Sequence, residues 1–104
     1  MPTWADVVRI GTQLEGVVEG TSYRTPALKA GKTLMCRLKE DAATLMVRVV
    51  DLDDKEALLH GHPDVLFTTP HYEGYASVLV RLAGVGEALL GELIEDAWRL
   101  GSAR

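Results

Sequence analysis

Side chains that could react or bind a ligand are most frequent in residues 62–82, which have the sequence HPDVLFTTPHYEGYASVLVRL. The middle of this stretch, residues 69–75, is a corner rich in proline, glycine and aromatic residues between two strand-like runs. It carries one imidazole and two phenols, at His71, Tyr72 and Tyr75, and these groups form a candidate small-ligand pocket. The simpler interpretation of His71 is a turn residue that hydrogen-bonds the backbone.

The sequence does not identify a catalytic residue in this stretch. A serine or threonine nucleophile needs an adjacent base that a third group orients, and Thr68, Thr69 and Ser77 have no such partners at a recognisable spacing. The pair Gly84-x-Gly86 is too short for a dinucleotide-binding loop. The sequence therefore predicts that the protein is not an enzyme and holds no cofactor.

Metal binding is the next chemistry to consider. His60 and His62, with His71 further on, supply imidazoles of the kind that bind divalent ions, but a structural site needs four well-placed ligands. No acidic or cysteine side chain stands at a tight spacing from them. The single cysteine, Cys36, lies mid-strand on a predicted inward face, which favours a small core residue over a nucleophile. The sequence predicts no metal site and no internal disulfide.

The spacing of apolar residues predicts the elements that position these groups. A helical period predicts helices that begin at Thr3, at Asp53 and after Gly86, and Gly101 is expected to end the last one. A period of two predicts strands over residues 21–28, 33–39, 44–50, 65–68 and 77–82. The order α-β-β-β-α-β-β-α predicts a two-layer α+β fold, with helices on one face of a five-stranded antiparallel sheet.

The alternation in the strands also predicts a basic outer face of the sheet, opposite the helices. We expect the inward residues to be Leu34, Cys36, Leu38, Leu45, Val47 and Val49. We expect the outward residues to be Met35, Arg37, Lys39, Met46, Arg48, Val50, Leu79 and Arg81. Acidic residues concentrate on the helices, so this face is a candidate site for phosphate or an acidic partner. The alternative is a solvated face whose long side chains cover apolar neighbours.

The bulk composition fits one soluble domain over residues 1–104. The chain is 47% hydrophobic and 25% charged, with a net charge of −4. That charge argues against a generic polyanion binder but allows one basic face. No apolar run approaches membrane-spanning length and no secretory signal begins the chain. The sequence therefore predicts a cytoplasmic protein without a membrane partner.

Several segments together resemble the MmcQ/YjbR family of small bacterial domains. The matching pieces are residues 19–23, 25–27, 31–32, 69–75, 78–82 and 93–100. The resemblance covers nearly the whole chain and implies an α-β(3)-α-β(2)-α fold similar to that of type III secretion chaperones. Arg24 and Ala76 depart from the family pattern, in which Gly and Pro are common at these positions.

The family is often labelled DNA-binding because its fold is similar to a double-wing nucleic-acid module. The resemblance therefore implies a non-catalytic binding domain, with DNA as its candidate partner. The residues expected to carry nucleic-acid or partner binding are Arg24, Arg37, Lys39, Arg48 and Arg81. The alternative is a protein-interaction or homodimerising module that uses Met35, Met46 and Leu79 of the same face. A ligand pocket or enzyme site at the corner of residues 69–75 is the third candidate.

Overall fold

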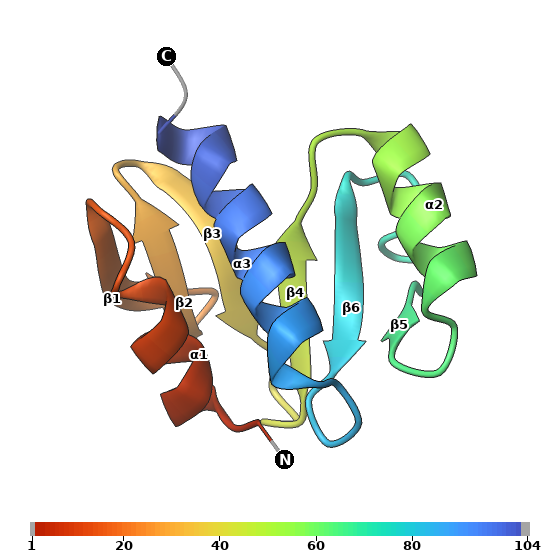
Figure 1. Ribbon diagram of the computed structural model, residues 1–104, viewed down its shortest axis with the longest axis horizontal. Helices are drawn as coiled ribbons and strands as arrows, with labels where there is room; N and C mark the ends of the chain where they lie inside the picture. The colour runs from red at the N-terminus through yellow and green to blue at the C-terminus, as the bar shows by residue number, and fades with distance from the viewer. Residues whose placement is uncertain (1, 103–104) are drawn as a thin grey trace.

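The computed structural model describes residues 2–102, and over this range the chain forms three helices and one six-stranded sheet. All strand pairs are antiparallel, in the spatial order β1-β2-β3-β4-β6-β5 (Figure 1). The elements are α1 (Trp4–Gly11), β1 (Val17–Ser22), β2 (Thr25–Ala30), β3 (Thr33–Leu38), β4 (Thr44–Arg48), α2 (Leu52–Gly61), β5 (Leu66–Phe67), β6 (Ser77–Arg81) and α3 (Glu87–Ser102). The predicted α+β class is confirmed, with one strand more than predicted.

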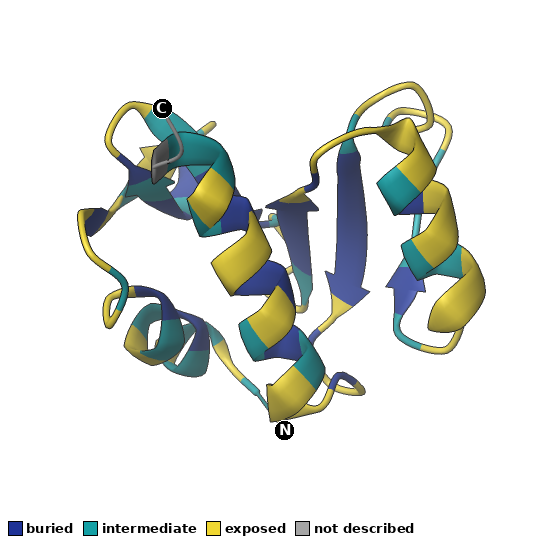
Figure 2. Ribbon diagram, turned by 45° about the horizontal axis from the view of Figure 1, so that its top comes forward, coloured by how far each residue is buried: buried dark blue, intermediate teal, exposed yellow. Residues whose placement is uncertain are grey.

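The helices form one layer and the sheet forms the other. Helix α3 packs across β2, β3 and β4, α1 packs beside α3, and α2 packs against β5 and β6 (Figure 1). The side of α3 that faces the sheet is buried and its opposite side is exposed (Figure 2). The largest fully buried side chains between the layers are Val7, Leu28, Met35, Cys36, Leu45, Val47, Leu66, Val78, Val80, Leu90 and Ile94. Burial of this apolar surface is the main stabilising contribution to the fold.

The additional strand comes from a hairpin near the N-terminus. The segment predicted as one broken strand over residues 21–28 is the junction of β1 and β2, which pair from Val17 with Ala30 to Ser22 with Thr25. Tyr23 and Arg24 connect them, and both have positive φ, of 52° and 69°. Two-residue hairpin turns with positive φ at both positions normally contain Asn and Gly. Neither is present here, so the sequence does not mark the turn.

A bulge changes the predicted faces of β3. Leu28 pairs with Cys36 and Lys29 pairs with Leu34, so Met35 is an extra residue in the ladder. As a result Met35 is fully buried in the core beneath the helices, at 0% exposure, whereas Leu34 faces the outer side. The predicted orientations of Leu34 and Met35 were therefore wrong. Beyond the bulge the alternation has its predicted phase, with Cys36 inside and Arg37 outside.

Two helix ends differ from the sequence prediction. Asp51, rather than Asp53, caps α2, because its carboxylate accepts a hydrogen bond from the backbone N–H of Asp54 at 2.8 Å. Gly101 lies within α3 instead of ending it. A Cβ atom at this glycine would lie 2.8 Å from the carbonyl oxygen of Ala30, so glycine allows α3 to approach β2 closely.

Within residues 2–102, none of the helices has both the length and the apolar character needed to span a membrane.

Candidate functional site

The residues on the outer face of the sheet form rows that run across the neighbouring strands. Side chains that stand opposite each other on neighbouring strands share a face. One row joins Arg37, Met46, Leu79 and Phe67 across β3, β4, β6 and β5. At one end of the sheet, Lys39 bonds Thr44, which pairs with Arg81, and towards the other end Arg48 pairs with Ser77. The structure thus places these four predicted basic residues on the face opposite the helices.

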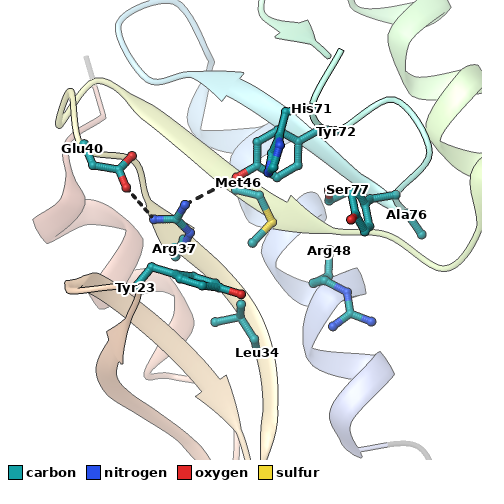
Figure 3. Close-up of a pocket in the computed structure, with 11 residues that line it drawn as sticks. Tyr23, Leu34, Arg37, Glu40, Met46, Arg48, His71, Tyr72, Ala76 and Ser77 are labelled. Carbon is teal, nitrogen blue, oxygen red and sulfur yellow. Dashed lines mark hydrogen bonds and ion pairs between the residues drawn. The ribbon is translucent and has the colours of Figure 1, made fainter. Parts of the chain in front are cut away.

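The corner of residues 69–75 closes one side of this face and forms a pocket of about 630 Å³ with it (Figure 3). The strands contribute apolar and basic side chains to the pocket, and the corner contributes aromatic ones. The lining residues are Tyr23, Leu34, Arg37, Glu40, Met46, Arg48, His71, Tyr72, Tyr75, Ala76 and Ser77. The sequence suggested the basic face and the corner as separate candidates, and the structure brings them together in one site.

Arg37 connects several of the residues around the pocket. Its side chain is buried, and one terminal nitrogen donates to the hydroxyl oxygen of Thr25 at 2.9 Å. The same nitrogen lies 3.5 Å from the Glu40 carboxylate, and the other donates to the Tyr72 hydroxyl oxygen at 3.4 Å (Figure 3). The guanidinium group also lies 5.2 Å from the centre of the Tyr23 ring. Arg37 therefore fixes the walls of the pocket, and its main hydrogen bonds go to protein groups.

Tyr72 is held by two cations. Its hydroxyl oxygen accepts hydrogen bonds from Lys39 Nζ at 2.9 Å and from Arg37, and Lys39 Nζ lies 4.7 Å from the ring centre. Partial burial raises the pKa of Tyr72, but the two hydrogen bonds and the two positive charges outweigh it, so the net shift of this pKa is downward. His71 meets the ring edge-on, with centroids 5.0 Å apart. The phenol is thus a polarised group in the wall of the pocket.

Other proteins resemble most of this chain in sequence and the whole of it in fold. The family model described as YjbR matches residues 12–100. The chain belongs to the YjbR family. Uncharacterized proteins of Mycobacterium bovis and Mycobacterium tuberculosis are 36% identical to it over 112 aligned positions, covering 94% of this chain and 87% of each relative. The crystal structure of a Deinococcus radiodurans protein with a DUF419 domain superposes with a TM-score of 0.80 at 25% identity, covering 100% of this chain and 81% of that one.

The sequence analysis missed one residue that shapes the site of this YjbR domain. Lys55 extends from α2 with only 4% of its surface exposed, and its ammonium group donates to the carbonyl oxygens of Tyr72 and Tyr75. Burial lowers the pKa of Lys55, and the charge of Glu73 acts in the opposite direction. The spacing of residues in α2 could have indicated this burial. Lys55 lies three residues before Leu58 and four before Leu59, so it shares the side of α2 that packs on the core.

The remaining basic residues predicted for binding differ in position. Arg48 lines the pocket, is exposed, and forms no ion pair with any residue from 2 to 102. Arg81 is exposed outside the pocket lining, and its guanidinium group lies 4.2 Å from the centre of the Phe67 ring. Arg24 is exposed in the turn between β1 and β2. Arg48 is therefore the cation best placed to meet a ligand in the pocket.

Several other predicted groups lie away from the site or inside the fold. Met46 and Leu79 are buried, as is Met35 in the core, so these residues offer little apolar surface to a partner. Cys36 is buried, and desolvation raises the pKa of its thiol to about 12, which disfavours the reactive thiolate. No three His, Cys, Asp or Glu side chains in the described part of the chain are grouped closely enough to hold a metal ion.

Proposed function

We propose that this YjbR domain binds nucleotides, with one base inserted in the pocket and its phosphate at Arg48. The observation that carries this proposal is the position of the two exposed tyrosines. Tyr23 is 81% exposed and Tyr75 is 61% exposed, yet both line the same pocket, from the β1–β2 turn and from the corner. Exposed aromatic rings beside a cation are the usual platform on which unstacked bases bind. A volume near 630 Å³ suits a ligand of this size.

The polar groups of the pocket fit the same ligand. Arg48 offers a guanidinium group without an acidic partner among residues 2–102, and a planar guanidinium group suits a phosphate. Ser77 and the Glu40 carboxylate add a hydroxyl and an acceptor to the lining. Leu34, which is only partly buried, supplies apolar surface to the lining. Flat, anionic molecules with hydrogen-bonding edges match this combination.

The geometry favours an unstacked nucleotide over duplex DNA. A base inside a duplex is stacked and paired, so it reaches a pocket only after extrusion. Long tracts of phosphate contacts are also disfavoured, because Arg37 and Lys39 are bonded to Tyr72 and the net charge is −4. A free nucleotide and a single strand both offer an unstacked base and a phosphate, so the experiment must distinguish these two ligands.

Fluorescence anisotropy with labelled single-stranded and duplex oligonucleotides, competed by free mononucleotides, tests the proposal. We expect the single strand to bind more tightly than the duplex, with a log–log salt slope of about −1, because only one or two phosphates are contacted. If mononucleotides displace the labelled strand at concentrations similar to those at which an unlabelled strand does, the free nucleotide is the ligand. Tyr75→Ala should weaken binding by roughly five- to 150-fold, from the loss of one stacked base.

Charge-reversal variants provide the matched control. Arg48→Glu should abolish binding, whereas Lys32→Glu makes the same charge change in the exposed β2–β3 turn, outside the pocket lining, and should leave binding nearly unchanged. If neither oligonucleotides nor mononucleotides bind at low salt, the proposal is wrong. Equal losses in the two variants would also contradict it, because they would indicate nonspecific charge attraction.

A further inference from the structure

The Tyr72 hydroxyl has a defined hydrogen-bonding direction. Lys and Arg side chains can only donate, so Lys39 and Arg37 both use the phenol oxygen as an acceptor. The hydroxyl hydrogen is then left for a different acceptor. No oxygen or nitrogen of residues 2–102 accepts a hydrogen bond from it, and Tyr72 lines the pocket. The hydrogen is therefore available to a bound molecule.

The two groups bonded to this hydroxyl are both donors, and the one carboxylate beside them, that of Glu40, is paired with both cations. The Lys39 ammonium group and the Arg37 guanidinium group stand next to it, and neither can accept a hydrogen bond. The three donors at this point, the Tyr72 hydroxyl and its two cationic partners, match an oxygen that has two lone pairs and no hydrogen. Among nucleobases, thymine, uracil and guanine present such a keto oxygen on the pairing edge, where adenine presents an amino group.

We propose that Tyr72 is the specificity-determining residue of the pocket, which donates a hydrogen bond to a keto oxygen of the inserted base and favours thymine, uracil or guanine over adenine. This inference rests on the proposed nucleotide binding. Lys39 and Arg37 act as positioning residues, because they donate to the phenol oxygen and leave its hydrogen for a bound ligand. Their charges also strengthen the donor by polarising the O–H bond.

Ionisation of Tyr72 should remove this preference. The phenol is a donor below its pKa, and above it the phenolate has no hydrogen to donate and repels a nearby phosphate. Lys39 and Arg37 lower the pKa of Tyr72 in the folded protein, so the loss should occur below pH 10, near which tyrosine ordinarily titrates. The ionisable groups that contact Tyr72 are Arg37, Lys39, Lys55, His71 and Tyr75. The other ionisable groups that line the pocket are Tyr23, Glu40 and Arg48, and the charge of Glu73 acts on Lys55.

The experiment measures the ratio of affinities for short oligo-dT and oligo-dA strands, in the wild type and in Tyr72→Phe, between about pH 7.5 and 9, where the thymine ring keeps its proton. This window lies above the range in which histidine ordinarily titrates. We expect the wild-type ratio to favour oligo-dT and to fall with rising pH. In Tyr72→Phe the ratio should drop by about three- to tenfold at neutral pH, the effect of one hydrogen bond, and lose its pH dependence. A pH dependence caused by Lys55 would persist in this variant.

A second variant tests the positioning role. Lys39→Met keeps the hydroxyl and should move the pH-dependent fall to higher pH, in step with the ultraviolet titration of tyrosinate in the free protein. If Tyr72→Phe leaves the oligo-dT to oligo-dA ratio unchanged while both strands still bind, this inference fails and the proposed function stands. If neither these strands nor free mononucleotides bind the wild type, the proposed function fails and the inference fails with it.

Discussion

The ammonium group of Lys55 lies 2.9 Å from the carbonyl oxygen of Tyr75, and it also donates to the carbonyl oxygen of Tyr72. Two backbone bonds complete this corner: the Tyr72 N–H donates to the Thr69 carbonyl and the Tyr75 N–H to the Tyr72 carbonyl. A side chain from α2 thus fixes the segment that carries the aromatic wall of the pocket. The shape of the site depends on a residue that is outside the pocket lining.

Replacement of Lys55 by methionine should loosen the corner. Methionine keeps most of the volume but removes one of the hydrogen bonds accepted by each of two carbonyl oxygens, so we expect the free energy of unfolding to fall by about 1–3 kcal/mol. Urea denaturation measures this change. Lys32→Met, at an exposed turn, should change stability by less than about 0.5 kcal/mol. A Lys55→Met variant as stable as the wild type would show that these hydrogen bonds do not hold the corner.

Two glycines of α3 provide a matched test of its packing. At Gly101 an added Cβ would lie 2.8 Å from both the carbonyl oxygen and the Cβ of Ala30, so Gly101→Ala should destabilise the fold by about 1–3 kcal/mol through overpacking. At Gly91 nothing lies within 4 Å of the added atom, so Gly91→Ala should stabilise it by up to about 1 kcal/mol through helix propensity. Thermal unfolding of the two variants should give shifts of opposite sign, and shifts of the same sign would contradict this packing.

The β1–β2 turn carries conformational strain that substitution should relieve. Arg24 has a φ of 69°, and the left-handed region costs an ordinary residue about 1–2 kcal/mol. Arg24→Gly removes this cost but adds entropy to the unfolded chain, so we expect a net gain of about 0.5–1 kcal/mol in stability. The expected result is a rise in Tm without any change in oligonucleotide binding at Arg48. A lower Tm would indicate that the Arg24 side chain stabilises the turn.

Asp41 should contribute to a loss of stability in acid. Its carboxylate accepts hydrogen bonds from the N–H of Ala43, from the Thr44 hydroxyl and from the Thr44 N–H, and these bonds lower its pKa below the ordinary value. The contribution is therefore complete above the unfolded pKa of about 3.9 and disappears as pH falls through the lower folded pKa.

Chemical denaturation across pH tests this contribution of Asp41. The stability difference between wild type and Asp41→Asn should be constant near neutral pH and shrink below about pH 4. Asp64→Asn is the control, because Asp64 is exposed and forms no hydrogen bond with another residue in the range 2–102. An Asp41→Asn difference that stays equal at low and neutral pH would exclude a native-state role for this carboxylate.

The alternation of residues in the strands was sufficient to predict most of the outer face, but not the orientation of every residue. Alternation after Cys36 placed Arg37, Lys39, Arg48 and Arg81 on the outer face correctly, because successive residues of a strand point to opposite faces of the sheet. It failed at Met35, since the bulge between β2 and β3 shifts the phase by one residue and leaves no mark in apolar spacing. Periodicity within one strand cannot reveal how its partner is aligned.

The pocket itself depends on contacts between distant segments. The corner at Tyr72 contacts Arg37 of β3 and Lys39, which directly follows β3, and these residues are 35 and 33 positions away in the chain. The sequence identified both groups as candidates but contained no signal that they meet. No role was predicted for Lys55, because a buried lysine is uncommon and only its tertiary partners distinguish it.

The most direct test of nucleotide binding in this pocket is an NMR titration of labelled protein with a short oligo-dT strand. We expect the largest amide shifts around the pocket, at Tyr23, Leu34, Tyr72, Tyr75 and Ser77, saturating with the affinity measured by anisotropy. Shifts concentrated on the helical layer, or no shifts at concentrations that saturate anisotropy, would show that the pocket is not the nucleotide site.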